Sequence, residues 1–179
     1  MTAATKNMEK VANAEPIIRS ARVGDLGEVR ELAEKIWRRH YPGIISHAQI
    51  DYMLAQRYSE DALREQIEGR DRWFDLLTVC GRTVGFANYL RTTQADEMKL
   101  DKLYLDQEYQ GRGLGRLMIE HVCAACRKLG MKRLVLAVNK HNTSAIVVYE
   151  RNGFAVRDAV KVDIGGGFFM DDYIMVKPL

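Results

Sequence analysis

The chain has few prolines, few cysteines and no long apolar stretch. Its 179 residues include three prolines and three cysteines. No segment approaches the roughly 18 consecutive apolar residues of a membrane span, and the first fifteen residues hold no apolar run of signal-peptide length. An odd, sparse set of cysteines argues against a disulfide framework and is typical of a reducing compartment. We therefore expect a cytoplasmic protein that does not contact membranes.

An excess of charge of one sign is also missing. The 27 basic and 24 acidic residues leave a net charge of +3, and both kinds are interspersed along the chain. Nucleic-acid-binding domains usually carry a concentrated basic patch or stripe, and no window here has the composition of a polybasic arm. We therefore expect no nucleic-acid partner.

One pair of cysteines has the spacing of metal ligands. Cys123 and Cys126 form a C-x-x-C motif, and His121 lies two residues before it. The pair falls inside a strongly helical pattern, and the chain has no second pair to complete four ligands. We interpret these cysteines as small apolar residues on a helix and predict no metal.

The pattern of apolar residues predicts one α/β domain. The length suits a single domain, and we expect a flexible N-terminal tail over 1–15 followed by one domain over 16–179. Helical periodicity predicts helices over 25–40, 113–129 and 142–151, with two more pieces between 47 and 68, and alternation predicts strands over 17–21, 73–80, 83–91, 98–105, 133–138, 154–163 and 168–176. Asp25 is the expected N-cap of the first helix.

Three of these elements form a β-α-β unit. The strands 98–105 and 133–138 flank the helix 113–129, and such a crossover makes its two strands parallel neighbours. Hairpins connect the other strands, which should therefore be antiparallel. We expect a mixed, mostly antiparallel central sheet with one parallel pair.

The strand 98–105 has an irregular pattern. Its apolar residues occupy positions 98 and 100, and then positions 103 and 105. A slip of one residue turns side chains to the opposite face unless a β-bulge absorbs it. We predict a bulge near Asp101-Lys102, with the strands 98–105 and 133–138 splaying apart at their C-terminal ends. The alternative is an amphipathic edge strand with a tolerated lysine.

A glycine-rich segment separates this strand from the following helix. It reads Gln110-Gly111-Arg112-Gly113-Leu114-Gly115-Arg116. Glycines permit close backbone approach, and the unpaired N–H groups of a first helical turn bind anions. The segment lacks the Lys-Ser/Thr of a P-loop, and the next strand lacks the carboxylate of a dinucleotide fold. It predicts a diphosphate cradle, with charge added by the arginines.

Three blocks of residues occur in a characteristic order. The first runs from Ile18-Arg19-x-Ala21 to Asp25-Leu26, the second is Gln110-x-x-Gly113-x-Gly115, and the third is Asn139, Asn142, Ala145, Tyr149 and Gly153-Phe154. Together they resemble the GNAT superfamily of N-acetyltransferases, which holds the coenzyme A pyrophosphate with a Q/R-x-x-G-x-G/A pattern like that of the second block. The C-terminal Asp171-Asp172-Tyr173-Ile174-Met175 also resembles the polyamine acetyltransferase (PaiA-like) subgroup.

The resemblance implies an enzyme that moves an acetyl group from acetyl-CoA to a primary amine by direct attack on the thioester. The implied pantetheine-binding strand residues are Leu103, Tyr104 and Leu105. The implied pyrophosphate-binding residues are Gln110, Gly111, Arg112, Gly113, Leu114, Gly115 and Arg116. Side chains of Asn139 and Asn142 are implied coenzyme contacts, although Asn142 suits a helix N-cap equally well.

The resemblance also assigns the proton transfers. Tyr149 matches the residue that protonates the departing thiolate, and its alternative role is aromatic packing. The fifth-strand glutamate that some members use as a base is replaced here by Ala137. Glu97 and Asp101 remain as candidate bases, and each is equally well explained as a solvated surface charge.

The acceptor is a primary amine in a small molecule or a peptide. The segment from His40-Tyr41-Pro42-Gly43 to Glu68 lies where the superfamily usually lines the acceptor site, and nearby carboxylates favour a polyamine or other small amine. The alternatives are a protein N-terminal or lysine acetyltransferase, and a non-catalytic acyl-CoA-binding module. The retained Tyr149 argues against that module, and Ala137 argues mildly for it. The last hairpin is the segment through which a homodimer would pair.

Overall fold

The computed structural model describes residues 15–179 and contains one mixed sheet. The expected tail, apart from Glu15, lies outside the described residues. The seven strands of the sheet lie in the order β1-β2-β3-β4-β5-β7-β6. They are β1 (Ile17–Ser20), β2 (Arg72–Val79), β3 (Arg82–Arg91), β4 (Glu97–Leu105), β5 (Arg133–Asn139), β6 (Ala155–Gly165) and β7 (Phe168–Pro178). Only β4 and β5 pair in parallel among these strands, which confirms the predicted fold class.

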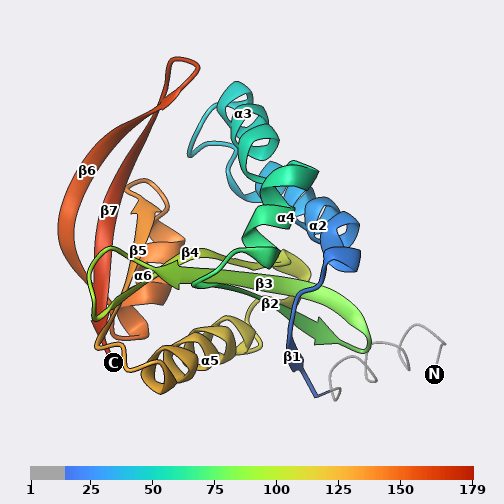
Figure 1. Ribbon diagram of the computed structural model, residues 1–179. Coiled ribbons are helices and arrows are strands. Elements are labelled where there is room, and N and C mark those ends of the chain that lie inside the picture. The colour runs from blue at the N-terminus through green and yellow to red at the C-terminus, as the bar shows by residue number, and fades with distance from the viewer. Residues whose placement is uncertain (1–14) are drawn as a thin grey trace.

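Helices cover both faces of the sheet (Figure 1). They are α2 (Leu26–His40), α3 (His47–Arg57), α4 (Glu60–Glu68), α5 (Leu114–Lys128) and α6 (Thr143–Arg151). Ser46 and Ser59 begin α3 and α4 because their hydroxyls accept the N–H groups of Gln49 and Ala62. None of the described helices is both long and apolar enough to cross a bilayer.

Asp25 occupies the N-cap position of α2, as predicted, but its side chain does not cap the helix. A 3-10 turn over Val23–Asp25 precedes the helix, and the Asp25 side chain makes no hydrogen bond to α2. Its carboxylate instead accepts the backbone N–H of Arg22 at 2.7 Å and pairs with Arg19 at 2.8 Å. The carboxylate therefore closes the preceding turn and links it to β1.

Two apolar cores lie on opposite faces of the sheet. One packs α5 and α6 against the sheet and includes Leu77 of β2, whereas the other packs α2, α3 and α4 and includes the neighbouring Leu76. This division follows from the alternation of side chains along a strand. Cys123 and Cys126 are buried in the first core, as expected of small apolar residues on a helix.

The predicted bulge in β4 is confirmed. Lys102 pairs with Asn88 of β3 and Leu100 pairs with Tyr89, so Asp101 is the extra residue. The parallel ladder between β4 and β5 ends at Leu100–Leu136. The C-terminal halves of the two strands therefore separate, and the backbone of β4 beyond the bulge loses its ladder partner on that side.

The β6–β7 hairpin extends past the sheet to α3 (Figure 1). The Tyr52 hydroxyl donates to the Ile164 carbonyl at 2.7 Å, and the Gln49 amide donates to the Phe169 carbonyl at 2.8 Å. Gly166 and Gly167 form the turn, and both of them and the preceding Gly165 have positive φ. The hairpin and α3 thus enclose the space beyond the end of β5.

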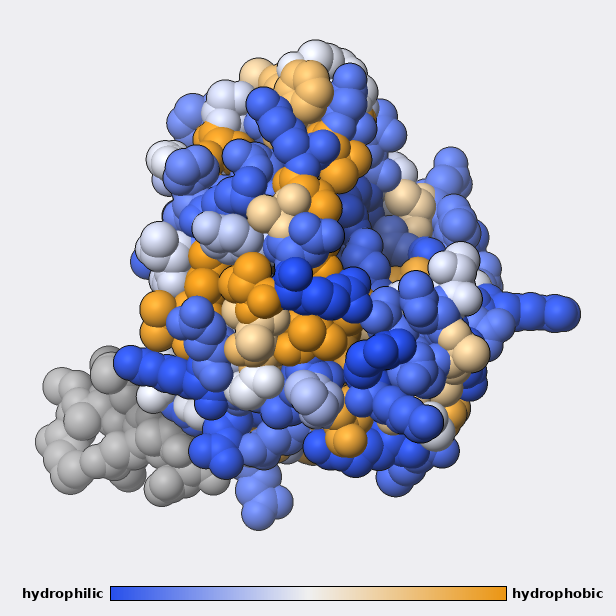
Figure 2. Space-filling view, turned by 90° about the vertical axis from the view of Figure 1, so that its left-hand side faces the viewer, coloured by the Kyte–Doolittle hydropathy of each residue, from blue (hydrophilic) through white to orange (hydrophobic). Residues whose placement is uncertain are grey.

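The edge strand β6 leaves apolar side chains exposed. Val156, Val162 and Phe169 of this hairpin have about half of their surface accessible. Figure 2 shows apolar side chains gathered on this side of the molecule among hydrophilic ones. A homodimer through the hairpin stays a prediction.

Candidate active site

A cavity of about 890 Å³ occupies the opening between β4 and β5. Its walls come from α2, α3, β4, the glycine segment, β5, α6 and the β6–β7 hairpin. The volume falls in the range of small-molecule sites. The separation of the two strands thus creates a passage between the two faces of the sheet.

The glycine segment forms one end of the cavity. Gly111 and Gly113 both have a φ of +76°, and Gly113 is the left-handed N-cap of α5. A Cβ atom placed on Gly111, Gly113 or Gly115 would meet no atom within 4 Å. The backbone therefore faces open space at all three glycines, as a cradle for a diphosphate requires.

The two arginines of this segment already have partners. Arg112 donates to the Glu108 carbonyl at 3.2 Å and lies 5.2 Å from the centre of the Tyr109 ring. Arg116 pairs with Glu120 at 2.7 Å, and its side chain is 73% exposed. Charges so exposed and partly balanced contribute little to binding compared with the backbone.

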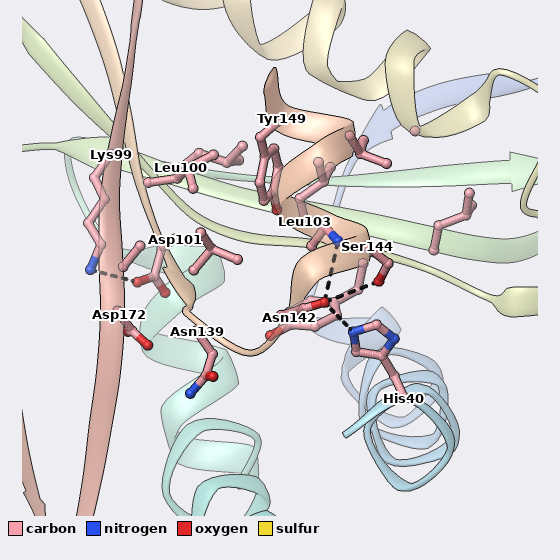
Figure 3. A pocket seen from close by; sticks show the side chains of 18 of the residues that line it. His40, Lys99, Leu100, Asp101, Leu103, Asn139, Asn142, Ser144, Tyr149 and Asp172 are labelled. Atoms are coloured by element: carbon pink, nitrogen blue, oxygen red, sulfur yellow. Dashed lines mark hydrogen bonds and ion pairs between the residues drawn. The ribbon is translucent and has the colours of Figure 1, made fainter. Parts of the chain in front are cut away.

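Asn139 and Asn142 lie where β5 meets α6 (Figure 3). Asn142 Oδ1 accepts from the Ala145 N–H at 3.4 Å and lies 3.2 Å from His40 Nε2. Asn139 Oδ1 accepts from the His141 N–H at 2.9 Å. The predicted helix cap at Asn142 is confirmed, so a coenzyme contact would use the amide N–H groups of these side chains.

Aromatic side chains form the wall on the α2 face. The Tyr41 and Tyr104 hydroxyls are 3.1 Å apart, and Trp37 donates to the Tyr58 hydroxyl at 3.2 Å. Burial raises the pKa of Tyr41 and of Tyr104 well above the usual value, so both phenols stay neutral. The structure therefore brings the predicted acceptor segment and the predicted pantetheine-binding residues of β4 to one cavity.

Tyr149 reaches into the same cavity from α6 (Figure 3). Its ring packs edge-on against Phe154, with 5.7 Å between centroids. Burial raises the pKa of Tyr149 to about 12. The phenol is thus protonated at neutral pH and is available as a donor to a group in the cavity.

The two predicted bases are held in ion pairs. Asp101 contacts Arg57 at 2.5 Å, Lys102 at 2.8 Å and Lys99 at 3.1 Å. These cations hold the pKa of Asp101 far below its usual range despite its burial. A carboxylate so stabilised in its charged form is a weak proton acceptor.

Glu97 lies at the other end of β4, before the strands separate. Its Oε2 contacts Arg157 at 2.7 Å and Arg133 at 4.0 Å, and the residue is only 5% exposed. The geometry therefore favours a structural role for Glu97 as well as for Asp101. Ala137 lines the cavity together with both carboxylates, and its methyl group cannot accept a proton.

Replacing Asp101 by asparagine should lower the free energy of unfolding by about 3 kcal/mol at pH 7, because it leaves the buried Lys102 without its partner. The lowered pKa means that Asp101 stabilises the fold above about pH 4 and loses this effect as the pH falls. Urea unfolding measures the free energy of unfolding of the wild type and of the variant, and the difference between the two should become smaller at acid pH. Glu60→Gln, in an exposed pair with Arg64, is the control and should change stability by less than about 1 kcal/mol. Equal losses in both variants would contradict the structural role of Asp101.

Comparison with known proteins agrees with this geometry. The sequence matches the Acetyltransferase (GNAT) family over residues 30–154, more than half of the chain. The chain belongs to the GNAT family. It is therefore an acetyltransferase, and its fold is a seven-stranded mixed sheet with a parallel β4–β5 pair.

Several relatives of this GNAT acetyltransferase have named activities. A spermidine N(1)-acetyltransferase of Thermoplasma acidophilum is 27% identical over 145 residues, which are 79% of this chain and 89% of the relative. A spermine/spermidine N(1)-acetyltransferase of Bacillus subtilis is 33% identical over 55% of this chain and 65% of its own length. The crystal structure of the PaiA N-acetyltransferase from T. acidophilum in complex with coenzyme A superposes with a TM-score of 0.81, at 26% identity and with coverage of 92% and 99%.

The cavity of this GNAT acetyltransferase also contains a buried acidic residue that was not predicted as part of the site. Asp172 of β7 is 8% exposed, and it shares a face of the strand with Met170 and Ile174, which also line the cavity. An acidic residue in phase with apolar ones on a strand was the available signal. Its burial, however, depends on the packing of β7 against β5.

Proposed function

We propose that this GNAT acetyltransferase transfers the acetyl group of acetyl-CoA to the primary amine of a small molecule, with polyamines as the first class to test. The observation that carries the proposal is the opening between β4 and β5, which leads from the glycine cradle to Tyr149. The similarity to spermidine and spermine acetyltransferases supports the acceptor class.

The residues present fit coenzyme A as a cosubstrate. The N–H groups from Gly111 to Arg116 would hold the pyrophosphate, since the three glycines leave the space that it requires. The backbone from Leu103 to Leu105 would pair with the pantetheine amides, because β5 no longer occupies that edge. Asn139 and Asn142 would donate from their amide groups.

The proposed reaction is a direct transfer with no acyl-enzyme. The amine nitrogen, once it has lost a proton, attacks the thioester carbonyl, and the C–N bond forms as the C–S bond breaks. Tyr149 gives its proton to the departing thiolate, since burial keeps the phenol neutral until that step. A water-poor cavity strengthens this hydrogen bond.

A thiol-release assay tests the proposal. Acetyl-CoA is supplied with spermidine, spermine, a small diamine, or a peptide with a free N-terminal alanine, and the free thiol is measured over time. The peptide is included because the chain is 37% identical, over 44% of its length, to the bS18-alanine N-acetyltransferase of Escherichia coli. We expect the polyamines to give the highest kcat/KM. If thiol is released only with the peptide, the acceptor is a protein N-terminus and not a polyamine. If the protein binds coenzyme A but releases no thiol with any of the amines, it is a non-catalytic module.

A further inference from the structure

Asp172 carries a buried carboxylate oxygen without a hydrogen-bond partner among the described residues. Its Oδ1 is shielded from solvent, and the residue lines the cavity. An unpaired charged oxygen in a protein interior costs several kcal/mol. Such groups are concentrated at functional sites, where a ligand supplies the missing partner.

The position of Asp172 suits contact with an acceptor. β7 places it directly opposite Asn139 at the end of β5, beyond the point where β5 separates from β4. Figure 3 shows both side chains, with Tyr149, around the same cavity. Tyr41, Tyr149 and Asp172 all line this cavity, so these polar groups border a common space.

Donor and acceptor reach this space from opposite faces of the sheet. Tyr149 packs against the core that contains α5, whereas Met170, on the same face of β7 as Asp172, packs against the core of α2, α3 and α4. A thioester carbonyl in the opening between the strands would therefore have its sulfur toward Tyr149 and its attacking amine toward Asp172. This arrangement separates the two proton transfers in space.

The charges around Asp172 do not neutralise it. Asp171 on its own strand repels a negative charge, whereas Lys99 of β4, Lys140 after β5 and Arg57 of α3 attract it. From β6 the residue paired with it is the uncharged Val160. Desolvation is the largest effect, and it raises the pKa of Asp172 to about 6. Lys140 is itself paired with Asp171, and Arg57 and Lys99 are paired with Asp101.

We propose that Asp172 is the catalytic base that removes a proton from the acceptor ammonium, directly or through one water. This inference rests on the proposed acetyl transfer. The ammonium N–H proton moves to the Asp172 carboxylate, and the freed lone pair forms the C–N bond. The C–S bond breaks, the thiolate takes the Tyr149 proton, and both side chains are later restored by exchange with solvent. A base with this affinity for protons is charged at pH 7 and yet a better acceptor than the ion-paired Asp101.

The test compares Asp172→Asn with its neighbour Asp171→Asn over pH 5 to 9. In the wild type, kcat/KM should fall tenfold per unit below about pH 6, because the base becomes protonated. Asp172→Asn should lower kcat by roughly 100-fold to 1,000-fold and remove this acidic limb. Asp171→Asn should keep the wild-type kcat/KM at neutral pH. It should shift the acidic fall of kcat/KM to lower pH, since it removes a negative charge that repels the Asp172 carboxylate. Lys99→Met should shift the limb to higher pH for the opposite reason.

A second acceptor separates a base from a mere binding group. An amine with a conjugate-acid pKa of roughly 8, such as an amino-acid amide, is partly neutral at the pH of the assay. With this amine as acceptor, Asp172→Asn should therefore lose much less of the wild-type kcat than it loses with a polyamine. A raised KM with unchanged kcat and an intact acidic limb would instead show that Asp172 only anchors the ammonium, and would overturn the inference.

The fold and the proposed function have separate controls. Asp172→Asn should unfold at the same temperature as the wild type or higher, because it removes an unpaired buried charge, and should bind coenzyme A normally. Coenzyme affinity and melting are therefore measured on each preparation, and Asp172→Ser is used if the asparagine variant melts early. An inactive wild type would overturn the acetyl transfer. An active wild type with an equally active Asp172→Asn would overturn only the role of Asp172.

Discussion

Replacing Gly113 by valine should weaken the binding of coenzyme A on the order of a hundredfold. Gly113 has a φ of +76° at the N-cap of α5, and a β-branched residue held there is strained by about 1–3 kcal/mol. The loop would relax by turning its N–H groups away from the pyrophosphate, and the valine methyl groups would enter the open space beside the backbone. Each loss of about 1.4 kcal/mol corresponds to a tenfold loss of affinity.

Two neighbouring substitutions act as controls in the same calorimetric titration. Gly115→Ala should retain most of the affinity, because Gly115 has no positive φ and the matching family pattern allows alanine there. Arg112→Ala should cost only a few-fold, because an exposed charge is worth about 1 kcal/mol or less. Normal binding by the Gly113 variant would show that the pyrophosphate lies elsewhere.

Replacing Tyr149 by phenylalanine should lower kcat by roughly tenfold to a thousandfold with little change in coenzyme affinity. The substitution removes only the hydroxyl, so the ring keeps its contact with Phe154. Without a donor, the thiolate must leave unprotonated or take its proton from water, which affects the transition state but not the bound cosubstrate. The raised pKa of Tyr149 keeps the wild-type donor protonated throughout pH 5 to 9.

Tyr173→Phe is the matched control for this hydroxyl. Tyr173 follows Asp172 on β7 and therefore points to the other face of the strand. Tyr173→Phe should therefore keep the wild-type kcat. Steady-state rates at saturating acetyl-CoA measure kcat for both Tyr149→Phe and Tyr173→Phe. A Tyr149 variant with wild-type rates at neutral pH would remove that residue as the acid. A loss of coenzyme affinity in the same variant would instead indicate a binding role.

Much of the architecture is encoded in short stretches of the sequence. The change of apolar phase between positions 100 and 103 predicted the β4 bulge, because a strand with one buried face tolerates an extra residue only as a bulge. The alternating glycines predicted a helix N-terminus with an open backbone, because only glycine adopts positive φ without strain. The 3-10 turn before α2 was missed, because Asp25 can accept N–H groups on either side of it.

The placement of charge could not be predicted in the same way. Asp101 was a candidate base by its position, but Arg57, distant in sequence, packs against it and fixes its negative charge. Glu97 was a candidate for the same reason and meets Arg157 of β6. A pKa depends on burial and on charges a few ångströms away, and both are properties of the packed molecule.

By itself, the sequence determined the bulge, the open backbone at the glycines and the cap at Asn142, because each depends on residues within about one turn or one strand of each other. It also indicated the parallel β4–β5 pair, because a β-α-β crossover makes its two strands parallel. Only the tertiary structure decided which carboxylate lies unpaired in the cavity. Asp172 acquires its raised pKa because β7 is inserted beside β5 and the β6–β7 hairpin docks on α3. A residue is desolvated when segments distant in sequence pack around it and exclude water. The amino acids next to that residue do not indicate which segments those are.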